Sequence, residues 1–484
     1  MPRRTKIVAT LGPATDAPKV LDGLLHAGVD VVRINLSHDT YAAHRRRAET
    51  MRNRAAASRR QPGLLADLQG PKIRIGRFRE HKVPLRVGDE FFLDAGCPLD
   101  DGDRIRVGLT YPELVRDVAC GDSLLLDDGA IQLRVDEVKN ARVRCEVIVG
   151  GTLSNNKGIN KQGGGLSAPA LTRKDREDIR FAAEIDADYL AVSFVRSAED
   201  VIEARRLLRD AGGKGGVVAK IERAEALECI EEIIEASDAI MIARGDLGVE
   251  IGDAKLPAEQ KHLIKLARRM NSVVITATQM MQSMIDNPVP TRAEVFDVAN
   301  AVMDGTDAVM LSAESSVGRN PPLVVEAMHR VCLEAEKQAE VRTSMHRIDT
   351  LFGRVDESIA MAAMYIANHL GVTAIAALTE TGSTVKWMSR ISSSIPIFAL
   401  TPNVATRRKV TLFRGVYPVA FDLADADYRK VNEEAIEELL RRGAVRNGDL
   451  VVITKGDRSG VEGQTNLMRV MRVGEHIIGP DRKD

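Results

Sequence analysis

A lysine and a glutamate stand two residues apart at the end of an apolar run, in the segment GVVAKIERAE that begins at Gly216. Successive side chains of a β-strand point to opposite faces, so Lys220 and Glu222 would share one face while Ile221 points to the other. An ammonium beside a carboxylate in a buried strand indicates either an internal ion pair or a reaction centre that uses both charges.

Other apolar runs also end in polar residues. Glu222 and Asp246 end consecutive runs and can share one hard divalent cation such as Mg²⁺, which would take water and substrate oxygens as its remaining ligands. Arg33 and Lys220 supply fixed positive charge around the same point, and a site of this composition suits a dense anion such as phosphate. The further residues at run ends are Thr10, Gly12, Asn35, Ser37, Asp67, Arg244, Gly245, Thr278, Ser312 and Glu314. Each alone also has a structural reading, as an ion pair, a turn residue or a helix cap.

Eight short apolar runs, rich in β-branched residues, alternate with helical patterns. Continuous apolar strands are typical of a parallel sheet that is covered on both faces. The runs are KIVATLG, VDVVRINLS, GLLADLQG, YLAVSFV, GVVAKIE, AIMIARGD, SVVITATQM and DAVMLSAE. Eight strand–helix units predict a closed (β/α)8 TIM barrel, in which active sites lie at the carboxyl ends of the strands.

Two further domains are expected beside the barrel. Between the third and fourth strands the pattern changes to short alternating segments with Gly and Asp turns, which predicts an inserted small β-barrel lid domain. Glycine-rich and proline-rich connections suggest a hinged lid, with a rigid decoration as the alternative. The last part of the chain alternates strands and helices again, as an open α/β domain does. The expected boundaries are 1–69 and 169–341 for the catalytic barrel, 70–168 for the lid, and 342–484 for a C-terminal regulatory domain.

Composition excludes several classes of protein. The 484 residues are 44% hydrophobic and 28% charged, with a formal net charge of −1, so we expect neither nucleic acid nor a membrane as partner. Five scattered cysteines without a CxxC pair indicate neither a zinc site nor a disulfide framework. The N-terminal run lacks a signal-peptide core, and we expect a cytoplasmic protein.

Six segments together resemble the signature segments of the pyruvate kinase family, in the family's order and along essentially the whole chain. They are KIVATLGPAT, VVRINLSH, DLQGPKIRIG, AKIE, MIARGDLGVE and TATQMMQSM. The resemblance implies transfer of the phosphoryl group of phosphoenolpyruvate to ADP, giving pyruvate and ATP. It also implies a Mg²⁺ cofactor, for which Mn²⁺ can substitute, regulation by a phosphorylated effector, and a homotetramer.

The resemblance also assigns roles to residues. Lys220 would lie against the transferring phosphoryl group, and Glu222 and Asp246 would hold the metal. Arg33, Gly245, Asp246 and Thr278 would bind phosphoenolpyruvate together with Lys220, and Thr278 and Ser312 are candidates for protonating the enolate through a water relay. The residues implied for nucleotide binding are Asn35, Ser37, His38, Arg74 and Lys174.

The chain departs from the family pattern in two places. The family's monovalent-cation region corresponds to Asn35, Ser37, Asp67 and the residue after it, and potassium-requiring members carry Glu where this chain has Lys72. A lysine ammonium can act as a tethered monovalent cation, so we expect that potassium is not required. The eighth-strand motif LSAESSVGRNP differs at Ala313, Ser315 and Asn320, which indicates a subgroup difference without loss of catalysis.

Two other segments remain. The loop TETGST is similar to the family's effector loop, and its hydroxyl and NH groups could bind a phosphate, although an ordinary turn is the alternative; its residues include Thr379, Thr381, Gly382, Ser383 and Thr384. The run Arg45–Arg47 is expected to be a solvated helix face without function. Two other functions stay open, a Mg²⁺-dependent lyase or mutase acting on phosphoenolpyruvate-like substrates and a non-catalytic sugar-phosphate sensor.

Overall fold

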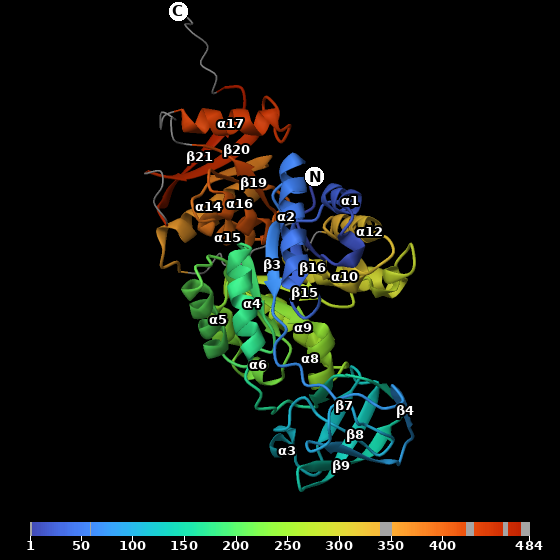
Figure 1. The fold of residues 1–484 in the computed structure, drawn as a ribbon. Coiled ribbons are helices and arrows are strands. Elements are labelled where there is room, and N and C mark those ends of the chain that lie inside the picture. The colour runs from blue at the N-terminus through green and yellow to red at the C-terminus, as the bar shows by residue number, and fades with distance from the viewer. Residues whose placement is uncertain (1, 59, 339–350, 423–429, 458–462, 476–484) are drawn as a thin grey trace, which may run out of the picture. The chain divides into compact units, whose positions relative to one another are not determined.

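A computed structural model describes residues 2–58, 60–338, 351–422, 430–457 and 463–475. Its central feature is a closed barrel of eight parallel strands in the order β1-β16-β15-β14-β13-β12-β3-β2 (Figure 1). These strands are the eight predicted apolar runs: β1 (Lys6–Thr10), β2 (Val31–Asn35), β3 (Gly63–Asp67), β12 (Tyr189–Val192), β13 (Gly216–Ile221), β14 (Ala239–Ala243), β15 (Val273–Ala277) and β16 (Ala308–Leu311). The predicted (β/α)8 fold is confirmed.

Helices follow the barrel strands. The longer ones are α1 (Pro18–Ala27), α2 (Tyr41–Ala57), α4 (Arg173–Glu184), α5 (Ala198–Asp210), α7 (Ile230–Ala236), α8 (Arg244–Ile251), α9 (Leu256–Arg269), α10 (Arg292–Asp304) and α12 (Pro321–Ala335). Helix α10 shows why they begin and end where they do. Thr291 Oγ1 accepts from the Glu294 amide while the Glu294 carboxylate accepts from the Thr291 amide, and Gly305 ends the helix at φ 98°.

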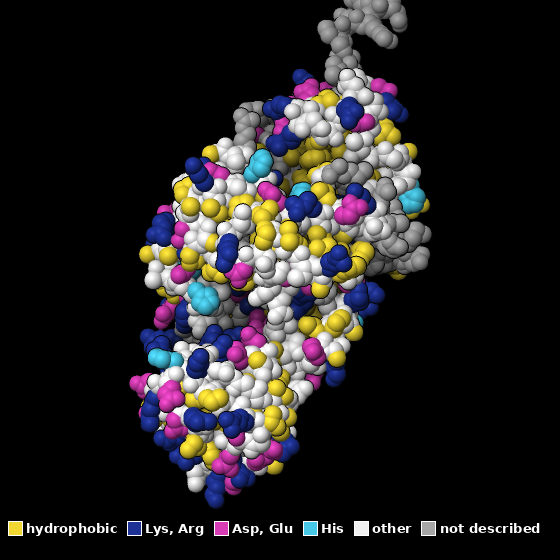
Figure 2. Space-filling model, turned by 90° about the vertical axis from the view of Figure 1, so that its right-hand side faces the viewer, with side chains coloured by type: hydrophobic (Ala, Val, Ile, Leu, Met, Phe, Trp, Pro, Cys, Tyr) yellow, Lys and Arg dark blue, Asp and Glu magenta, His cyan; other side chains and the backbone are white. Residues whose placement is uncertain are grey.

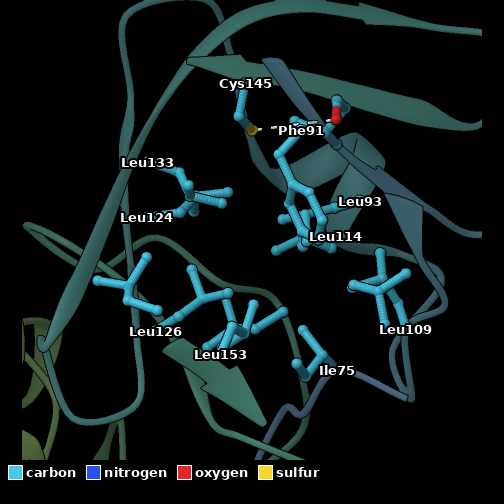
Figure 3. Packing of buried hydrophobic residues seen from close by; sticks show 14 of the residues in the cluster. Ile75, Phe91, Leu93, Leu109, Leu114, Leu124, Leu126, Leu133, Cys145 and Leu153 are labelled. Atoms are coloured by element: carbon cyan, nitrogen blue, oxygen red, sulfur yellow. Dashed lines mark hydrogen bonds between the residues drawn. The ribbon is translucent and has the colours of Figure 1, made fainter. Parts of the chain in front are cut away.

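The insert between β3 and β12 is an all-β domain, as predicted. Its strands form a six-stranded sheet, β11-β7-β8-β9-β5-β6, and a two-stranded sheet of β10 and β4. Alternate residues face one buried core, in which Phe91, Leu93, Leu124 and Leu133 lie close together (Figure 3). The strands are β4 (Lys82–Leu85), β5 (Glu90–Asp94), β6 (Arg106–Val107), β7 (Ser123–Leu126), β8 (Ile131–Lys139), β9 (Arg142–Val149), β10 (Gly151–Ser154) and β11 (Ile159–Lys161), with helix α3 (Leu114–Asp117).

The C-terminal part is the expected open α/β domain. Its sheet has the order β19-β18-β17-β20-β21, and only the pairing of β20 with the edge strand β21 is antiparallel among the pairs described. The elements are α14 (Val355–Leu370), β17 (Ala374–Leu378), α15 (Ser383–Ser389), β18 (Ile397–Thr401), α16 (Val404–Lys409), β19 (Val416–Ala420), α17 (Val431–Arg441), β20 (Leu450–Gly456) and β21 (Thr465–Arg472).

Two compact units divide the chain. Residues 1–66, 185–189 and 264–484 form the first, which contains β1, β2, β15, β16 and the C-terminal domain. Residues 67–184 and 190–263 form the second, which contains the all-β insert, β13 and β14. The expected boundary at 341/342 lies outside the described residues, and the other domain boundaries stay predictions.

The surface agrees with the near-zero net charge. Basic and acidic side chains are interspersed over the face drawn in Figure 2. In the part of the chain that the structure describes, no helix is both long and apolar enough to cross a membrane. All five cysteines are free thiols.

Candidate active site

Lys220, the last-but-one residue of β13, lies in a cluster of acidic and hydroxyl groups in the second unit. Its Nζ is 2.9 Å from Glu222 Oε1 and 3.2 Å from Asp67 Oδ1, and it donates to Ser193 Oγ at 2.6 Å. Only 9% of Lys220 is exposed, and Glu222 and Asp67 are buried. The predicted side-by-side placement of Lys220 and Glu222 is therefore present, with a second carboxylate added.

Burial raises the pKa of Glu222, and the negative charges of Asp246 and Asp67 raise it further, whereas the ammonium of Lys220 lowers it. The Phe194 amide donates to Glu222 Oε2 at 2.8 Å, which orients the carboxylate. A buried carboxylate that other carboxylates oppose is an environment that a divalent cation would stabilise, because the cation would neutralise the excess negative charge.

Asp246 lies in the first turn of α8, immediately after β14, and Gly245 precedes it. Lys72 Nζ is 3.2 Å from Asp246 Oδ1, so this lysine contacts a predicted metal ligand. No group of three or more His, Cys, Asp or Glu side chains arranged for a metal occurs among the described residues. Two carboxylates with several water or substrate oxygens are a normal set for Mg²⁺, so Glu222 and Asp246 fit this ion.

The insert is also fixed to helices of the second unit where the chain leaves it. The Gly163 amide donates to the Glu250 carbonyl at 2.9 Å, and the Gly165 amide donates to the carboxylate of Glu225. A Cβ atom on Gly164 would lie 2.6 Å from Glu225 Oε2, so only glycine fits there without a shift. Close contact therefore favours glycine at position 164, while Gly163 and Gly165 share its positive φ.

In the first unit, Arg33 lies on β2 and donates from Nη1 to Thr10 Oγ1 of β1 at 3.0 Å. Asn35 is the last residue of β2, and its Oδ1 accepts from the Ser37 amide of the following loop at 3.1 Å. His38 follows, and its carbonyl accepts from His44 Nε2 at 2.7 Å. These residues lie in consecutive positions on one strand end and its loop, as the sequence predicts.

Thr278 and Ser312 follow β15 and β16 in the same unit. Thr278 has φ 70° and its hydroxyl donates to the Ala277 carbonyl at 2.6 Å. A β-branched residue rarely adopts this left-handed conformation, and such strain is concentrated at functional sites. The buried Glu314 accepts from the Ser312 amide at 2.7 Å and from the Met281 amide at 3.2 Å, so this strand-end carboxylate holds the two loops.

Two predicted nucleotide residues contact other groups of the second unit. Arg74 donates to the Asn156 carbonyl at 2.8 Å within the insert. Lys174 Nζ lies 2.6 Å from Asp178 Oδ2, one turn further along α4. Their predicted role is not visible in these contacts and stays a prediction.

Sequence reasoning missed one group of the Lys220 cluster and misjudged one arginine. Ser193 follows β12 directly, and the signal was the one polar residue inside the run YLAVSFV. In the Arg45–Arg47 run, Arg45 and Arg46 are exposed, but Arg47 is buried and pairs with Asp16 and Asp39. The expectation of a wholly solvated face was wrong at Arg47, since this position falls on the inward side of α2.

The TETGST loop joins β17 to α15. The Gly382 amide donates to Thr379 Oγ1 at 3.0 Å, and the hydroxyls of Thr381 and Ser383 share a hydrogen bond of 2.9 Å. Thr384 is buried and bonded to Thr465 at 2.7 Å, so its hydroxyl faces the interior of the domain.

Comparison with known proteins identifies the family. Residues 2–325 match the family described as "Pyruvate kinase, barrel domain", and residues 357–471 match "Pyruvate kinase, alpha/beta domain". The chain belongs to the pyruvate kinase family. It is 55% identical over 475 residues to "Pyruvate kinase II" of Salmonella typhimurium, which covers 97% of this chain and 99% of that protein.

More distant pyruvate kinases also match along their full length. The pyruvate kinase of Haemophilus influenzae is 52% identical over 475 residues, with 97% of this chain and 99% of that protein covered. The pyruvate kinase of Mycobacterium intracellulare is 42% identical over 479 residues, and the match covers 99% of this chain and 100% of that protein. The chain is therefore a phosphotransferase of the pyruvate kinase family, and the insert and the C-terminal domain belong to that family's architecture.

Proposed function

We propose that this protein transfers the phosphoryl group of phosphoenolpyruvate to ADP, giving pyruvate and ATP. The observation that carries the proposal is the buried Lys220 ammonium held by Glu222, Asp67 and Ser193 in a chain of this family. Oriented by these contacts before substrate arrives, the ammonium is ready to stabilise charge on the transferring phosphoryl oxygens without reorganising.

The other roles follow the family motifs. Arg33 binds the phosphate of phosphoenolpyruvate, with Gly245, Asp246 and Thr278 contacting the rest of the substrate. Mg²⁺, or Mn²⁺ in its place, supplies further neutralisation of the phosphoryl oxygens when Glu222 and Asp246 hold it. The residues proposed for nucleotide binding are Asn35, Ser37, His38, Arg74 and Lys174.

Two proton-transfer candidates lie at strand ends of the first unit. After the phosphorus–oxygen bond of phosphoenolpyruvate breaks, the enolate carbon must accept a proton to become pyruvate. Thr278 and Ser312 are proposed to orient the water relay that delivers it, because a hydroxyl alone is a poor acid. A loss of solvent-proton exchange into pyruvate in Thr278→Ala, with phosphoryl transfer partly retained, would support this role.

One assay tests the reaction against its rivals. Pyruvate formation from phosphoenolpyruvate is followed with lactate dehydrogenase and NADH, with and without ADP. Formation that depends on ADP supports the proposal, whereas formation without ADP favours a lyase or mutase. No formation under either condition, together with binding of a sugar phosphate, favours a sensor.

Independence from potassium is a further proposal. It is supported by the contact of Lys72 with Asp246, which brings a permanent monovalent cation to the predicted metal site. Initial rates are measured against KCl at constant ionic strength, held with a tetramethylammonium salt. If the unmodified protein requires potassium for activity, Lys72 would have a structural role only, in the connection between the barrel and the insert. The substitution Lys72→Glu is expected to create a potassium requirement.

Regulation by a phosphorylated effector at residues 379–384 is proposed from the similarity of the loop to the family's effector loop. A sugar phosphate should lower the KM for phosphoenolpyruvate, and Ser383→Glu should abolish this response by charge repulsion. Thr384 is unsuitable for this substitution because its side chain is buried. A response that survives in Ser383→Glu places the effector elsewhere.

A homotetramer is proposed as the assembled form, and the cytoplasmic location stays a prediction. Exposed apolar side chains support self-association through α10, where Phe296 is 70% and Met303 41% exposed. Strand β21 offers a second surface, because it stands at the edge of its sheet among the strands that the structure describes. Sedimentation velocity measures the assembly, and a monomer at micromolar concentration would contradict the proposal.

A further inference from the structure

Helix α2 has an inward face that carries two charged or polar side chains among its apolar ones. Its buried residues are His44, Arg47, Ala48, Met51 and Ala55, which recur at helical spacing. An arginine buried to 6% exposure on such a face needs partners for its donors. Those partners lie in the two loops that follow β1 and β2.

Arg47 joins these two loops. Its Nε donates to Asp16 Oδ1 at 2.6 Å and its Nη2 to Asp16 Oδ2 at 3.1 Å, which is a two-pronged contact with the loop after β1. Its Nη1 donates to Asp39 Oδ2 at 2.6 Å in the loop after β2. The bond to Arg47 lowers the pKa of Asp39 below its ordinary value, although burial opposes the shift.

The loop after β2 has hydrogen bonds of its own, from the Ser37 amide to Asn35 Oδ1 at 3.1 Å and from the His38 amide to the Asn35 carbonyl at 3.4 Å, but neither involves Asp39. Asp39 has φ 60°, in the left-handed region that glycine favours and aspartate tolerates. His44 Nε2 donates to the His38 carbonyl at 2.7 Å, so a second side chain of α2 also contacts this loop. Residues 36–39 lie beyond the end of β2, and the contacts of Arg47 and His44 tie this loop to α2.

We propose that Arg47 is a positioning residue for nucleotide binding, which sets the conformation of residues 36–39 through Asp39 and anchors it on Asp16. The inference rests on the proposed function, since Ser37 and His38 of this loop are proposed nucleotide residues, together with Asn35 at the end of β2. Arg47 itself acts through Asp39 and is not assigned a contact with the nucleotide.

Phosphoenolpyruvate binding should be much less sensitive to Arg47, because Arg33 lies within the strand. Arg33 pairs with Thr10 in the parallel ladder of β1 and β2, and its carbonyl accepts from the Leu11 amide at 2.8 Å. Barrel pairing therefore fixes Arg33 independently of α2. Loss of Arg47 should therefore change the conformation of residues 36–39 and leave β2, with Arg33, unchanged.

The run of three arginines supplies a matched control. Arg47→Met removes the buried guanidinium, and Arg45→Met removes an exposed one two residues earlier on the same helix. Arg47→Lys keeps the charge but cannot hold two carboxylates with a fork. Asp39→Asn keeps a side chain that tolerates φ 60° and removes only the charge.

Steady-state constants and direct binding are measured for each variant. Arg47→Met should raise both the KM for ADP and the Kd for MgADP about tenfold, which corresponds to about 1.4 kcal/mol of binding free energy. The Kd is measured by calorimetry in the absence of phosphoenolpyruvate. The KM for phosphoenolpyruvate and kcat at saturating ADP should stay within about twofold, as in Arg45→Met. For Arg47→Lys and Asp39→Asn, the KM for ADP and the Kd for MgADP should lie between those of Arg45→Met and Arg47→Met.

Three results would overturn the inference. The first is that Arg47→Met and Arg45→Met have the same KM, kcat and Kd values. The second is that Arg47→Met changes both KM values and kcat by the same factor. The third is a lower thermal midpoint of Arg47→Met with an unchanged affinity for MgADP, which would mean a purely structural role. A wild-type protein that binds MgADP but produces no pyruvate refutes the reaction and still tests Arg47 through Kd. A wild-type protein that does not bind MgADP refutes both.

Discussion

Replacement of Lys220 by Met removes the ammonium while keeping an unbranched apolar stem. In the structure Nζ lies 2.6 Å from Ser193 Oγ, 2.9 Å from Glu222 Oε1 and 3.2 Å from Asp67 Oδ1, with 9% of the residue exposed. Loss of one preorganised donor at a developing charge commonly lowers kcat by about 10²–10³. Because Lys220 carries a full charge in a nearly dry site, we expect a loss of about 10³, or about 4 kcal/mol, with a smaller effect on KM.

The same substitution should make the metal-free protein less stable. Glu222 and Asp67 remain buried without their ammonium, and an uncompensated buried charge costs about 3–5 kcal/mol. Mg²⁺ bound by Glu222 would replace part of the missing positive charge. The thermal midpoint of Lys220→Met should therefore rise more on adding Mg²⁺ than that of the unmodified protein.

The assay is the lactate dehydrogenase-coupled rate, with protein purified from a host that lacks its own pyruvate kinase. Lys214→Met is the control, because Lys214 is exposed just before the same strand and its loss should leave kcat unchanged. Lys220→Arg keeps the charge in a different geometry and separates charge from placement. Turnover of Lys220→Met within tenfold of the unmodified protein would refute the proposed role and favour the internal ion pair as a structural feature.

Further predictions concern stability and the insert. Burial raises the pKa of Asp188 from 3.8 to about 7, so its stabilising contribution is complete below pH 3.8 and is lost as the pH rises through about 7. Asp188→Asn should therefore gain stability relative to the unmodified protein as the pH rises from 3.8 to about 7, reaching about 4 kcal/mol, and a pH-independent difference in thermal midpoint would contradict this pKa. Arg390→Met leaves the buried Asp307 without the guanidinium that pairs with it and should lower the unfolding free energy by about 3 kcal/mol. An unchanged thermal midpoint would refute this, because the Val274 and Arg414 backbone amides that still donate to Asp307 carry no charge. If the insert closes as a lid, small-angle scattering with Mg²⁺, ADP and a non-reacting phosphoenolpyruvate analogue should show a smaller radius of gyration than the ligand-free protein, whereas identical profiles would favour a rigid decoration.

Much of the barrel was predictable because its signals are local. Each strand is a continuous run of β-branched and aliphatic residues, and each connection carries its own helix period or capping residues, so strand number and order follow from reading along the chain. The strand-end positions of Lys220, Glu222, Asp246 and Thr278 were likewise visible, since each closes such a run. Family motifs then attached roles to them.

Only the tertiary structure decided which of these groups meet. Ser193 and Asp67 reach Lys220 from other strands, and Lys72 contacts Asp246 across a sequence separation of 174 residues, which no local pattern encodes. The arginine run shows the same limit within one helix, because three identical residue types differ only in the direction that each side chain takes from the helix axis. Helix geometry fixes each direction, but the loops against which α2 packs decide which direction is buried. Arg47 is therefore a buried link between Asp16 and Asp39, whereas Arg45 is exposed.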